Sequence, residues 1–88
     1  MVRRRVLVRG RVQGVGFRMS CARRARDLEL GGSVRNRPDG TVEAVFEGPA
    51  GAVERMVDWC RTGPPLAHVT GVTVDDEVPA GVAEFAVA

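Results

Sequence analysis

The stretch GRVQGVGFR, residues Gly10–Arg18, separates two segments whose apolar residues recur with different periods. From Val2 to Val12, the even positions Val2, Val6, Val8 and Val12 are apolar, and the odd positions are arginines except for Leu7. This period of two predicts a strand with one face in solvent. After Arg18 the spacing becomes helical up to Leu30, with apolar positions at Cys21, Ala22, Ala25 and Leu28. The stretch is therefore predicted to be a short loop between a strand and a helix.

Downstream of this helix, the sequence predicts a β-hairpin. Gly31 and Gly32 are expected to end the helix, because glycine accepts the left-handed backbone of a C-terminal cap. Strands are predicted at Ser33–Arg37 and Thr41–Glu47, on either side of RPDG, residues Arg37–Gly40. Proline presets the first turn position and glycine takes the positive φ, so the two strands are expected to be antiparallel neighbours.

The rest of the chain supplies a second helix and two more strands. Pro49 suits the first turn of a helix that TGPP, residues Thr62–Pro65, brings to an end. The apolar stripe of this helix consists of Val53, Met56, Val57 and Cys60. Trp59 lies beside the stripe and is expected to pack in the core. Strands are predicted at Val69–Glu77 and, after PAG, at Glu84–Val87.

The order β-α-β-β-α-β, with a short terminal strand, predicts an α+β fold, the ferredoxin-like two-layer sandwich. The helical crossover makes the first two strands parallel, and both helices then cover one face of a mostly antiparallel sheet. Because parallel strands end at the same edge of a sheet, Arg18 and Asn36 are expected to lie close together. At 88 residues, the chain is expected to form one domain, residues 1–88.

Charge is distributed unevenly along the chain, although the formal net charge is only +2. Residues 1–37 hold eleven arginines and two acidic residues, whereas residues 38–88 hold two arginines and nine acidic residues. A concentration of positive charge favours an anionic ligand. From charge alone, however, a basic face in solvent is an equal alternative.

Composition also argues against several classes of protein. No run of about 18 apolar residues could span a membrane, and the basic N-terminal segment lacks the apolar core of a secretory signal, so a cytoplasmic location is expected. Cys21, Cys60 and His68 fit no metal-binding spacing. The two cysteines occupy apolar helical positions and are expected to be buried free thiols. No metal site and no cofactor are therefore predicted.

The loop itself has features of an anion-binding site. It precedes a helix N-terminus, where backbone N–H groups have no intrahelical partner. Gly14 and Gly16 let the chain curl so that successive N–H groups point inward, and Arg18 adds a guanidinium fork that matches two phosphate oxygens. The stretch is neither GxGxxG nor a Walker loop. On these residues alone, a phosphate cradle and a tight strand–helix turn are equal alternatives.

Together, GRVQGVGFR and GGSVRNRPDGTVEAVFEG, residues Gly31–Gly48, resemble the paired signature of the acylphosphatase family. GPPLAHV, residues Gly63–Val69, is similar to the segment before that family's fourth strand. The resemblance covers the chain from end to end without an insertion. Two features depart from the family pattern. Ser33 replaces a large apolar residue, which is expected to affect packing rather than chemistry, and the final EFAVA lacks the common closing tyrosine.

The resemblance implies an enzyme that hydrolyses the carboxyl–phosphate bond of acyl phosphates, giving a carboxylate and inorganic phosphate. It implies that Arg18 binds the phosphoryl group and that Asn36 positions the attacking water. The phosphoryl oxygens would be held by the backbone amides of Gln13, Gly14, Val15, Gly16, Phe17 and Arg18. The expected partners are a small acyl phosphate and the product phosphate, which would also inhibit. No nucleic acid, membrane or second subunit is expected.

Two alternatives would use the same fold. A basic RNA-binding module would stack bases on aromatic residues of the central strands, but the chain has no tyrosine and only 5% aromatic residues. A non-catalytic regulatory domain, like those within larger hydrogenase-maturation proteins, would share the resemblance. The presence of both Arg18 and Asn36, and the length of the chain, favour the enzyme.

Overall fold

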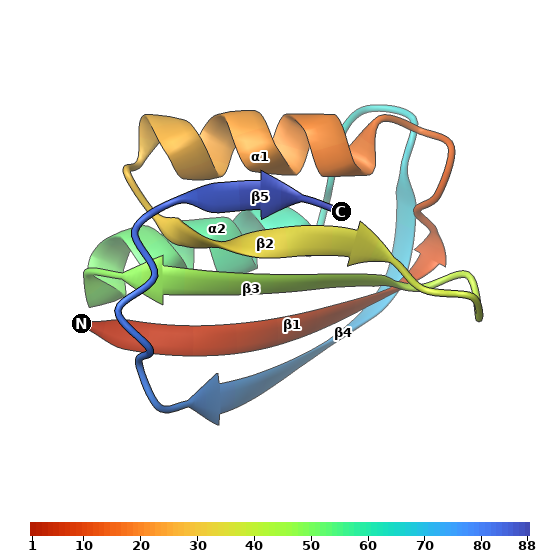
Figure 1. Cartoon of the computed structure of the whole chain (residues 1–88). Coiled ribbons are helices and arrows are strands. Elements are labelled where there is room, and N and C mark those ends of the chain that lie inside the picture. Colours follow the sequence, from red (N-terminus) through yellow and green to blue (C-terminus); the bar gives the residue numbers. More distant parts are fainter.

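The structure, a computed structural model, describes residues 1–88 and contains five strands and two helices. In chain order these are β1 (Val2–Arg11), α1 (Phe17–Asp27), β2 (Gly31–Asn36), β3 (Val42–Gly48), α2 (Ala50–Cys60), β4 (His68–Glu77) and β5 (Phe85–Val87). The strands form one sheet in the order β4-β1-β3-β2-β5, and both helices lie on the same face of it (Figure 1). The predicted ferredoxin-like two-layer sandwich is confirmed.

The strand pairing places the ends of β1 and β2 at one edge of the sheet. β1 lies between β3 and β4 and is antiparallel to both, so that Arg3 is opposite Glu47 on one side and Glu77 on the other. β2 is antiparallel to β3 and parallel to the short β5. β1 and β2 therefore run in the same direction on either side of β3, toward the edge that carries the β1–α1 loop and the β2–β3 turn (Figure 1).

Between the sheet and the helices lies a core of 17 buried residues. The alternation predicted for the first strand is confirmed at Val6 and Val8, which are 0% exposed. Cys21 and Cys60 are also fully buried and form no disulfide, so the predicted free thiols are confirmed. A hydrogen bond with the Cys60 thiol, and then burial, raises the pKa of Cys21, so this sulfur stays protonated at neutral pH.

The first helix ends before its predicted glycine cap. Glu29, rather than a glycine, adopts the left-handed backbone after α1, with a φ of 58°. Gly31 and Gly32 instead belong to β2, where an added Cβ atom would collide with the carbonyl oxygen of Val82 or of Val45, respectively. The close approach of neighbouring backbone, not helix capping, therefore explains these two glycines.

Two predictions for the second helix are also corrected. Pro49 precedes α2 as its N-cap residue and does not lie in the first turn. Trp59 packs against the core but is only partly buried, since it also lines a surface groove, unlike Met56, which is 1% exposed. The Trp59 ring packs against Phe17, with the two ring centroids 5.0 Å apart. The last turn of α2 thus contacts the first residue of α1, next to the β1–α1 loop.

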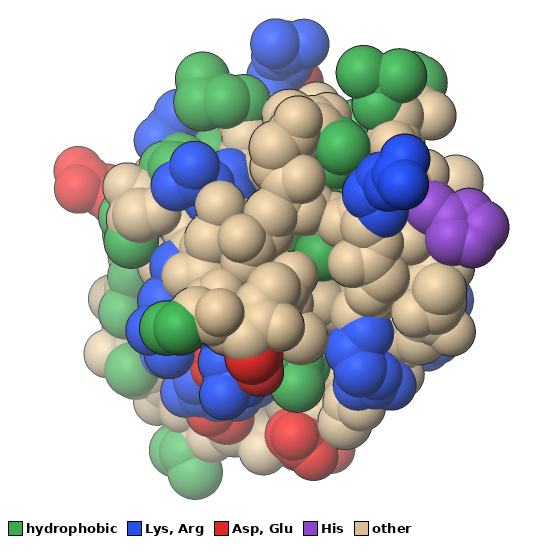
Figure 2. Space-filling model, turned by 90° about the vertical axis from the view of Figure 1, so that its right-hand side faces the viewer, with side chains coloured by type: hydrophobic (Ala, Val, Ile, Leu, Met, Phe, Trp, Pro, Cys, Tyr) green, Lys and Arg blue, Asp and Glu red, His purple; other side chains and the backbone are tan.

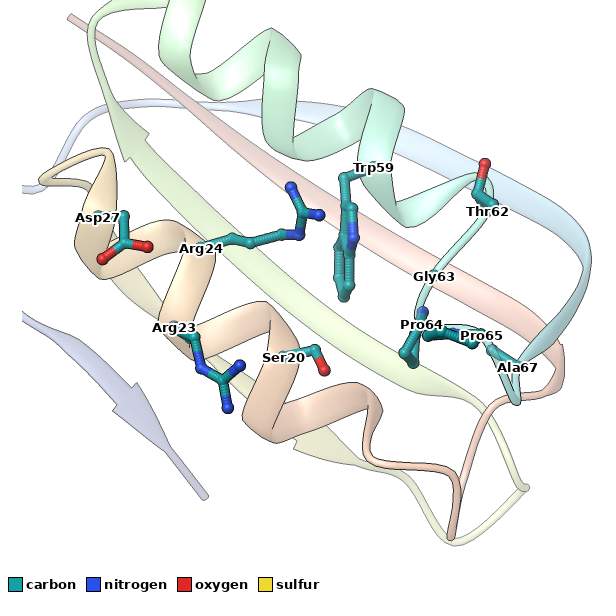
Figure 3. Close-up of a pocket in the computed structure, with 10 residues that line it drawn as sticks. All are labelled: Ser20, Arg23, Arg24, Asp27, Trp59, Thr62, Gly63, Pro64, Pro65 and Ala67. Carbon is teal, nitrogen blue, oxygen red and sulfur yellow. The ribbon is translucent and has the colours of Figure 1, made fainter.

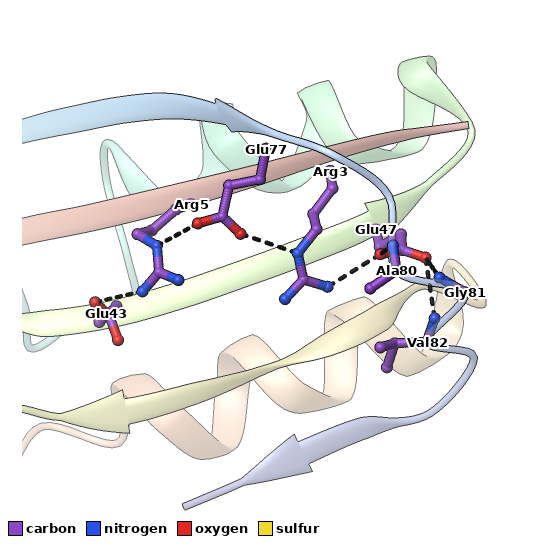
Figure 4. A network of polar contacts seen from close by, with 8 residues as sticks. All are labelled: Arg3, Arg5, Glu43, Glu47, Glu77, Ala80, Gly81 and Val82. Carbon is purple, nitrogen blue, oxygen red and sulfur yellow. Dashed lines mark hydrogen bonds and ion pairs between the residues drawn. The ribbon is translucent and has the colours of Figure 1, made fainter.

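Ion pairs cover the face of the sheet that carries no helix (Figure 4). Arg3 donates to Glu77 at 2.9 Å and to Glu47 at 3.0 Å. Arg5 donates to Glu77 at 2.6 Å and lies 2.8 Å from an oxygen of Glu43. Each of these pairs joins an arginine of the basic half of the chain to an acidic residue of the other half. Part of the charge asymmetry in the sequence is therefore satisfied within the molecule.

Glu47 also fastens the segment between β4 and β5. Its carboxylate is only 4% exposed and accepts hydrogen bonds from the amides of Ala80, Gly81 and Val82 at 2.8, 2.7 and 3.0 Å (Figure 4). The Ala80 amide, together with Arg3 and the other two amides, holds the pKa of Glu47 below its ordinary value of 4.5. The sequence predicted a strand that ends at Glu47 but did not predict the burial of this carboxylate.

Candidate active site

The β1–α1 loop turns through two glycines with left-handed backbone. Gly14 and Gly16 have φ values of 74° and 79°. An added Cβ at either position would meet no atom within 4 Å. The positive φ therefore favours glycine here, and the space in front of the loop is open.

The backbone N–H groups of this loop donate no hydrogen bonds within the protein. No backbone carbonyl accepts a hydrogen bond from the amides of residues 13–16. Gly16 is the N-cap residue of α1 and offers no side-chain cap, and the first helical bond runs from the Ser20 N–H to the Gly16 carbonyl at 3.1 Å. The amides of the first helical turn consequently also lack a helical partner. Together with the helix dipole, these N–H groups can bind an anion.

Arg18 and Asn36 line one cavity, as the predicted topology required. The cavity has a volume of about 290 Å³, and these two residues enter it from the first turn of α1 and the end of β2. The other lining residues are Val12, Gly14, Gly16, Phe17, Met19 and Val87. Arg18 is thus the only charged residue of the lining. The cavity combines an anion anchor with a neutral amide side chain that can both donate and accept hydrogen bonds.

Figure 2 shows the end of the molecule that carries the β1–α1 loop and the β2–β3 turn. Arginine side chains are spread over this end, and the single histidine, His68, lies at its side. His68 begins β4, is exposed and does not line the cavity. The positive charge around the cavity favours the approach of an anion.

The side chain of Gln13 connects the loop to the hairpin turn. Its Nε2 donates to the carbonyl oxygen of Arg37 at 2.7 Å and to that of Thr41 at 3.0 Å. Arg37 directly follows Asn36, so this contact ties the end of β2 to the loop. The sequence predicted only the Gln13 backbone amide as functional, because a side-chain contact between residues so distant in sequence has no local signature.

The guanidinium of Arg18 also contacts the end of the chain. Its Nη1 donates to the carbonyl oxygen of Ala88 at 2.8 Å. The Ala88 amide donates in turn to the carbonyl of Val34 at 2.9 Å, which continues the pairing of β5 with β2. The residues after β5 therefore help to orient the Arg18 side chain. Nothing in the sequence pattern indicated this contact.

The side chains of the remaining loop residues serve mainly as anchors. Phe17 is 2% exposed and belongs to the core, and Val15 packs partly against the core. Phe17 also lines the cavity, whereas Val15 and Gln13 do not. Ser33, on β2, lies outside the cavity lining and is paired with Val45 and Ala86 within the sheet.

A larger groove, of about 790 Å³, lies between α1 and the turn that follows α2 (Figure 3). In it the Arg24 guanidinium lies over the ring of Trp59, 5.4 Å from the centroid. The groove is lined by neither Asn36 nor any residue of Gln13–Arg18. The candidate active site is therefore the smaller of the two cavities. It is chosen by its chemistry and not by its size, because it combines free amides with a guanidinium and a carboxamide.

No group of three or more His, Cys, Asp or Glu side chains is arranged to hold a metal ion. Neither of the helices has the length and apolarity needed to cross a membrane.

Comparisons with known proteins agree along almost the whole chain. A family model described as Acylphosphatase matches residues 4–87. The acylphosphatase of Methylococcus capsulatus is 56% identical over 88 residues, covering 99% of this chain and 96% of that protein. The acylphosphatase of Thermococcus kodakarensis is 55% identical over 86 residues, covering 98% and 94%. The crystal structure of acylphosphatase from Bacillus subtilis has a TM-score of 0.96 at 38% identity, covering 100% and 99%.

These similarities extend over both sequence motifs and over the cavity between them. The matched family region begins within β1 and ends at the last residue of β5, so no element of the fold lies outside it. The resemblance inferred from the motifs is confirmed. The chain belongs to the acylphosphatase family and is an enzyme that hydrolyses acyl phosphates.

Proposed function

We propose that the cavity lined by Arg18 and Asn36 hydrolyses acyl phosphates by direct in-line attack of water on the bound phosphoryl group. The observation that carries this proposal is that both residues line one cavity beside amides that no protein group occupies. One side of the reacting phosphorus is then available for a cationic anchor, and the other for a water molecule.

The phosphoryl group binds to the amides of Gln13–Arg18 and to the guanidinium of Arg18. Phosphoryl transfer passes through a loose, metaphosphate-like transition state, with charge spread over three equatorial oxygens. The amides are already oriented by the loop and the helix, so they stabilise this charge without reorganisation. A preorganised donor of this kind contributes about 3–4 kcal/mol.

Asn36 positions the attacking water through its carboxamide and does not act as a base. The water oxygen bonds to phosphorus as the bond from phosphorus to the acyl oxygen breaks, and the carboxylate leaves. The proton of the water passes to a phosphoryl oxygen, so the products are a carboxylate and inorganic phosphate. A carboxylate leaving group is stable at neutral pH, so no general acid is needed.

In this proposal, residues 1–88 act as one catalytic domain, as a monomer in the cytoplasm, on a small-molecule substrate and without a cofactor. Arg18 and the loop amides provide the positive charge that a divalent cation supplies in other phosphoryl-transfer sites. Inorganic phosphate leaves as product and can rebind to the same donors.

The decisive experiment follows phosphate release from acetyl phosphate, with a stable phosphate monoester as control. We expect rapid release from acetyl phosphate only. In water enriched in ¹⁸O, the label should enter the phosphate and not the acetate, because attack occurs at phosphorus. Label in the acetate would contradict attack at phosphorus, and absence of turnover would contradict the proposed function altogether.

Two inhibition measurements test the electrostatic part of the proposal. Activity should persist in excess chelator, and inorganic phosphate should inhibit competitively, because it binds to the same amides. Activity that disappears with chelator and returns with magnesium would contradict a metal-independent mechanism. Noncompetitive inhibition would indicate that phosphate binds elsewhere.

A further inference from the structure

The apolar residues of the proposed active-site cavity divide into a floor and a rim. Val12 and Phe17 are 1% and 2% exposed and lie beneath the loop. Met19 and Val87 line the same cavity but are 65% and 38% exposed. These two side chains therefore stand where the cavity opens to solvent, and we call them the apolar rim.

Packing in the core does not explain why the two residues of the apolar rim are apolar. Met19 lies in the first turn of α1, whose buried residues are Phe17, Cys21, Ala22 and Ala25. Neither Met19 nor Val87 belongs to the buried core or to the residues that pack against it. Single exposed apolar side chains are common on proteins. Here, however, two of them come from elements at opposite ends of the chain and line the opening of one small cavity.

The position of the apolar rim determines which part of a substrate it meets. The phosphoryl group occupies the free amides and Arg18, so the acyl group extends toward the opening. No charged side chain other than Arg18 lines the cavity, and Arg18 binds the phosphoryl group, so a carboxylate on the acyl group would have no ion-pair partner within the cavity. Methionine is flexible and polarizable and adapts to apolar groups of different shape.

We infer that this enzyme prefers acyl phosphates with an apolar acyl group, and that Met19 and Val87 determine this preference. The inference rests on the proposed function, because it takes the phosphoryl group to be bound by Arg18 and the loop amides. It adds a substrate class, namely acyl phosphates whose acyl group is an uncharged chain or ring of several carbons. These are expected to be preferred over acetyl phosphate and over acyl phosphates whose acyl group carries a carboxylate.

Binding of three stable phosphonates, measured by calorimetry, tests the inference without hydrolysis. Methylphosphonate occupies only the phosphoryl subsite, butylphosphonate adds an alkyl chain, and 2-carboxyethylphosphonate adds a charged chain. We expect butylphosphonate to bind about fivefold more tightly than methylphosphonate, since its additional methylene groups are only partly removed from water at an open rim. 2-Carboxyethylphosphonate should bind no more tightly than methylphosphonate.

Three variants identify the residues responsible. Met19→Ser and Val87→Thr remove apolar surface without altering Arg18 or Asn36, and combining them should bring the butyl-to-methyl affinity ratio close to one. Leu66→Ser is the matched control, because Leu66 is 76% exposed and lies outside the cavity. The Leu66→Ser protein should have the same butyl-to-methyl affinity ratio as the unmodified enzyme.

The outcomes separate this inference from the proposed function. Equal affinity for all three phosphonates, tighter binding of the carboxylated one, or an equal effect of Leu66→Ser would overturn the inference while leaving hydrolysis intact. Failure of every phosphonate to bind would overturn the inference together with the assigned phosphoryl subsite. A normal butyl preference in a protein that hydrolyses no acyl phosphate would refute the proposed function and leave the preference established.

Discussion

Arg18 combines charge with geometry, and a lysine variant separates the two. Lysine keeps the positive charge but replaces a planar fork with a hydrated point charge on a flexible stem. In-line attack requires a fixed phosphoryl group, and a small misplacement can cost about 100-fold in rate. We expect Arg18→Lys to fold normally, to bind phosphate more weakly and to lose at least about 100-fold in kcat/KM for acetyl phosphate.

Arg23→Lys provides the control for this measurement. Arg23 is an exposed residue of the same helix and lies outside the cavity. Its replacement should leave kcat/KM within about twofold of the original value, since exposed substitutions away from a site have small effects. Near-normal turnover of a folded Arg18→Lys enzyme would show that positive potential is sufficient without the fork.

The role proposed for Asn36 predicts an effect on chemistry rather than on binding. Asn36→Ala should lower kcat strongly while KM and the inhibition constant of phosphate change little, because the phosphoryl donors remain. Asn36→Asp should also have a strongly lowered kcat, since its carboxylate faces the negative charge of the substrate. If Asn36→Ala weakened phosphate binding and preserved kcat, Asn36 would be an anion ligand instead.

At the level of elements, the glycines of β2 offer a test of backbone crowding. Gly31→Ala places a methyl group against the carbonyl of Val82 and should lower the free energy of unfolding by about 2–4 kcal/mol. Gly51→Ala, at an open position in α2, should instead raise it by about 0.5 kcal/mol, because alanine is the better helix former. Urea unfolding measures both. A Gly31→Ala protein of unchanged stability would show that β2 can move away from its neighbour.

The elements themselves could be predicted from the sequence, but not all their ends. Hydrophobic period identified β1 and both helices, because a strand and a helix bury different positions, and the turn signals of RPDG identified the hairpin of β2 and β3. The end of α1 was predicted incorrectly, since local capping rules assign Gly31 and Gly32 to a helix cap. Their actual requirement comes from segments far away in the sequence, Val45 and Val82, which no local pattern contains.

For the molecule as a whole, the uneven distribution of charge produces both a basic end and an ion-paired sheet face. Glu47 joins the two halves of the chain through Arg3 and also binds the segment before β5. Arg5 and Arg3 similarly lower the pKa of Glu77. A carboxylate with a lowered folded-state pKa stabilises the fold fully above its ordinary pKa of 4.5 and loses this contribution as the pH falls through the folded-state value.

These carboxylates should accordingly change the melting temperature little between pH 7 and pH 5. At pH values below about 4.5, the melting temperature should decrease. Glu47→Gln should melt at a lower temperature at pH 7, and its difference from the original protein should shrink as the pH falls. Glu54→Gln, an exposed change of the same charge on α2, is the control and should have little effect. A constant difference between Glu47→Gln and the original protein at every pH would contradict the role of ionised Glu47.

The candidate site could be predicted in part, for a topological reason. A crossover that makes β1 and β2 parallel is sufficient to bring Arg18 and Asn36 to one edge, and the structure brings them into one cavity. The contact of Gln13 with the hairpin turn and the contact of Arg18 with Ala88 could not be predicted. They depend on the exact placement of loops and chain ends, which only the assembled tertiary structure determines.

The central position of β1 has a consequence for how the chain reaches its native state. β1 is synthesised first, yet one of its two partners is β4, with Arg3 opposite Glu77 and Arg11 opposite His68. A nascent chain that ends before residue 68 therefore leaves one side of β1 as an unpaired edge. Such sequence-distant pairing makes folding slow compared with a helical bundle of the same length, and the exposed edge invites association between unfinished chains. The chain is therefore most open to such association before β4, residues His68–Glu77, has been synthesised and has paired with β1.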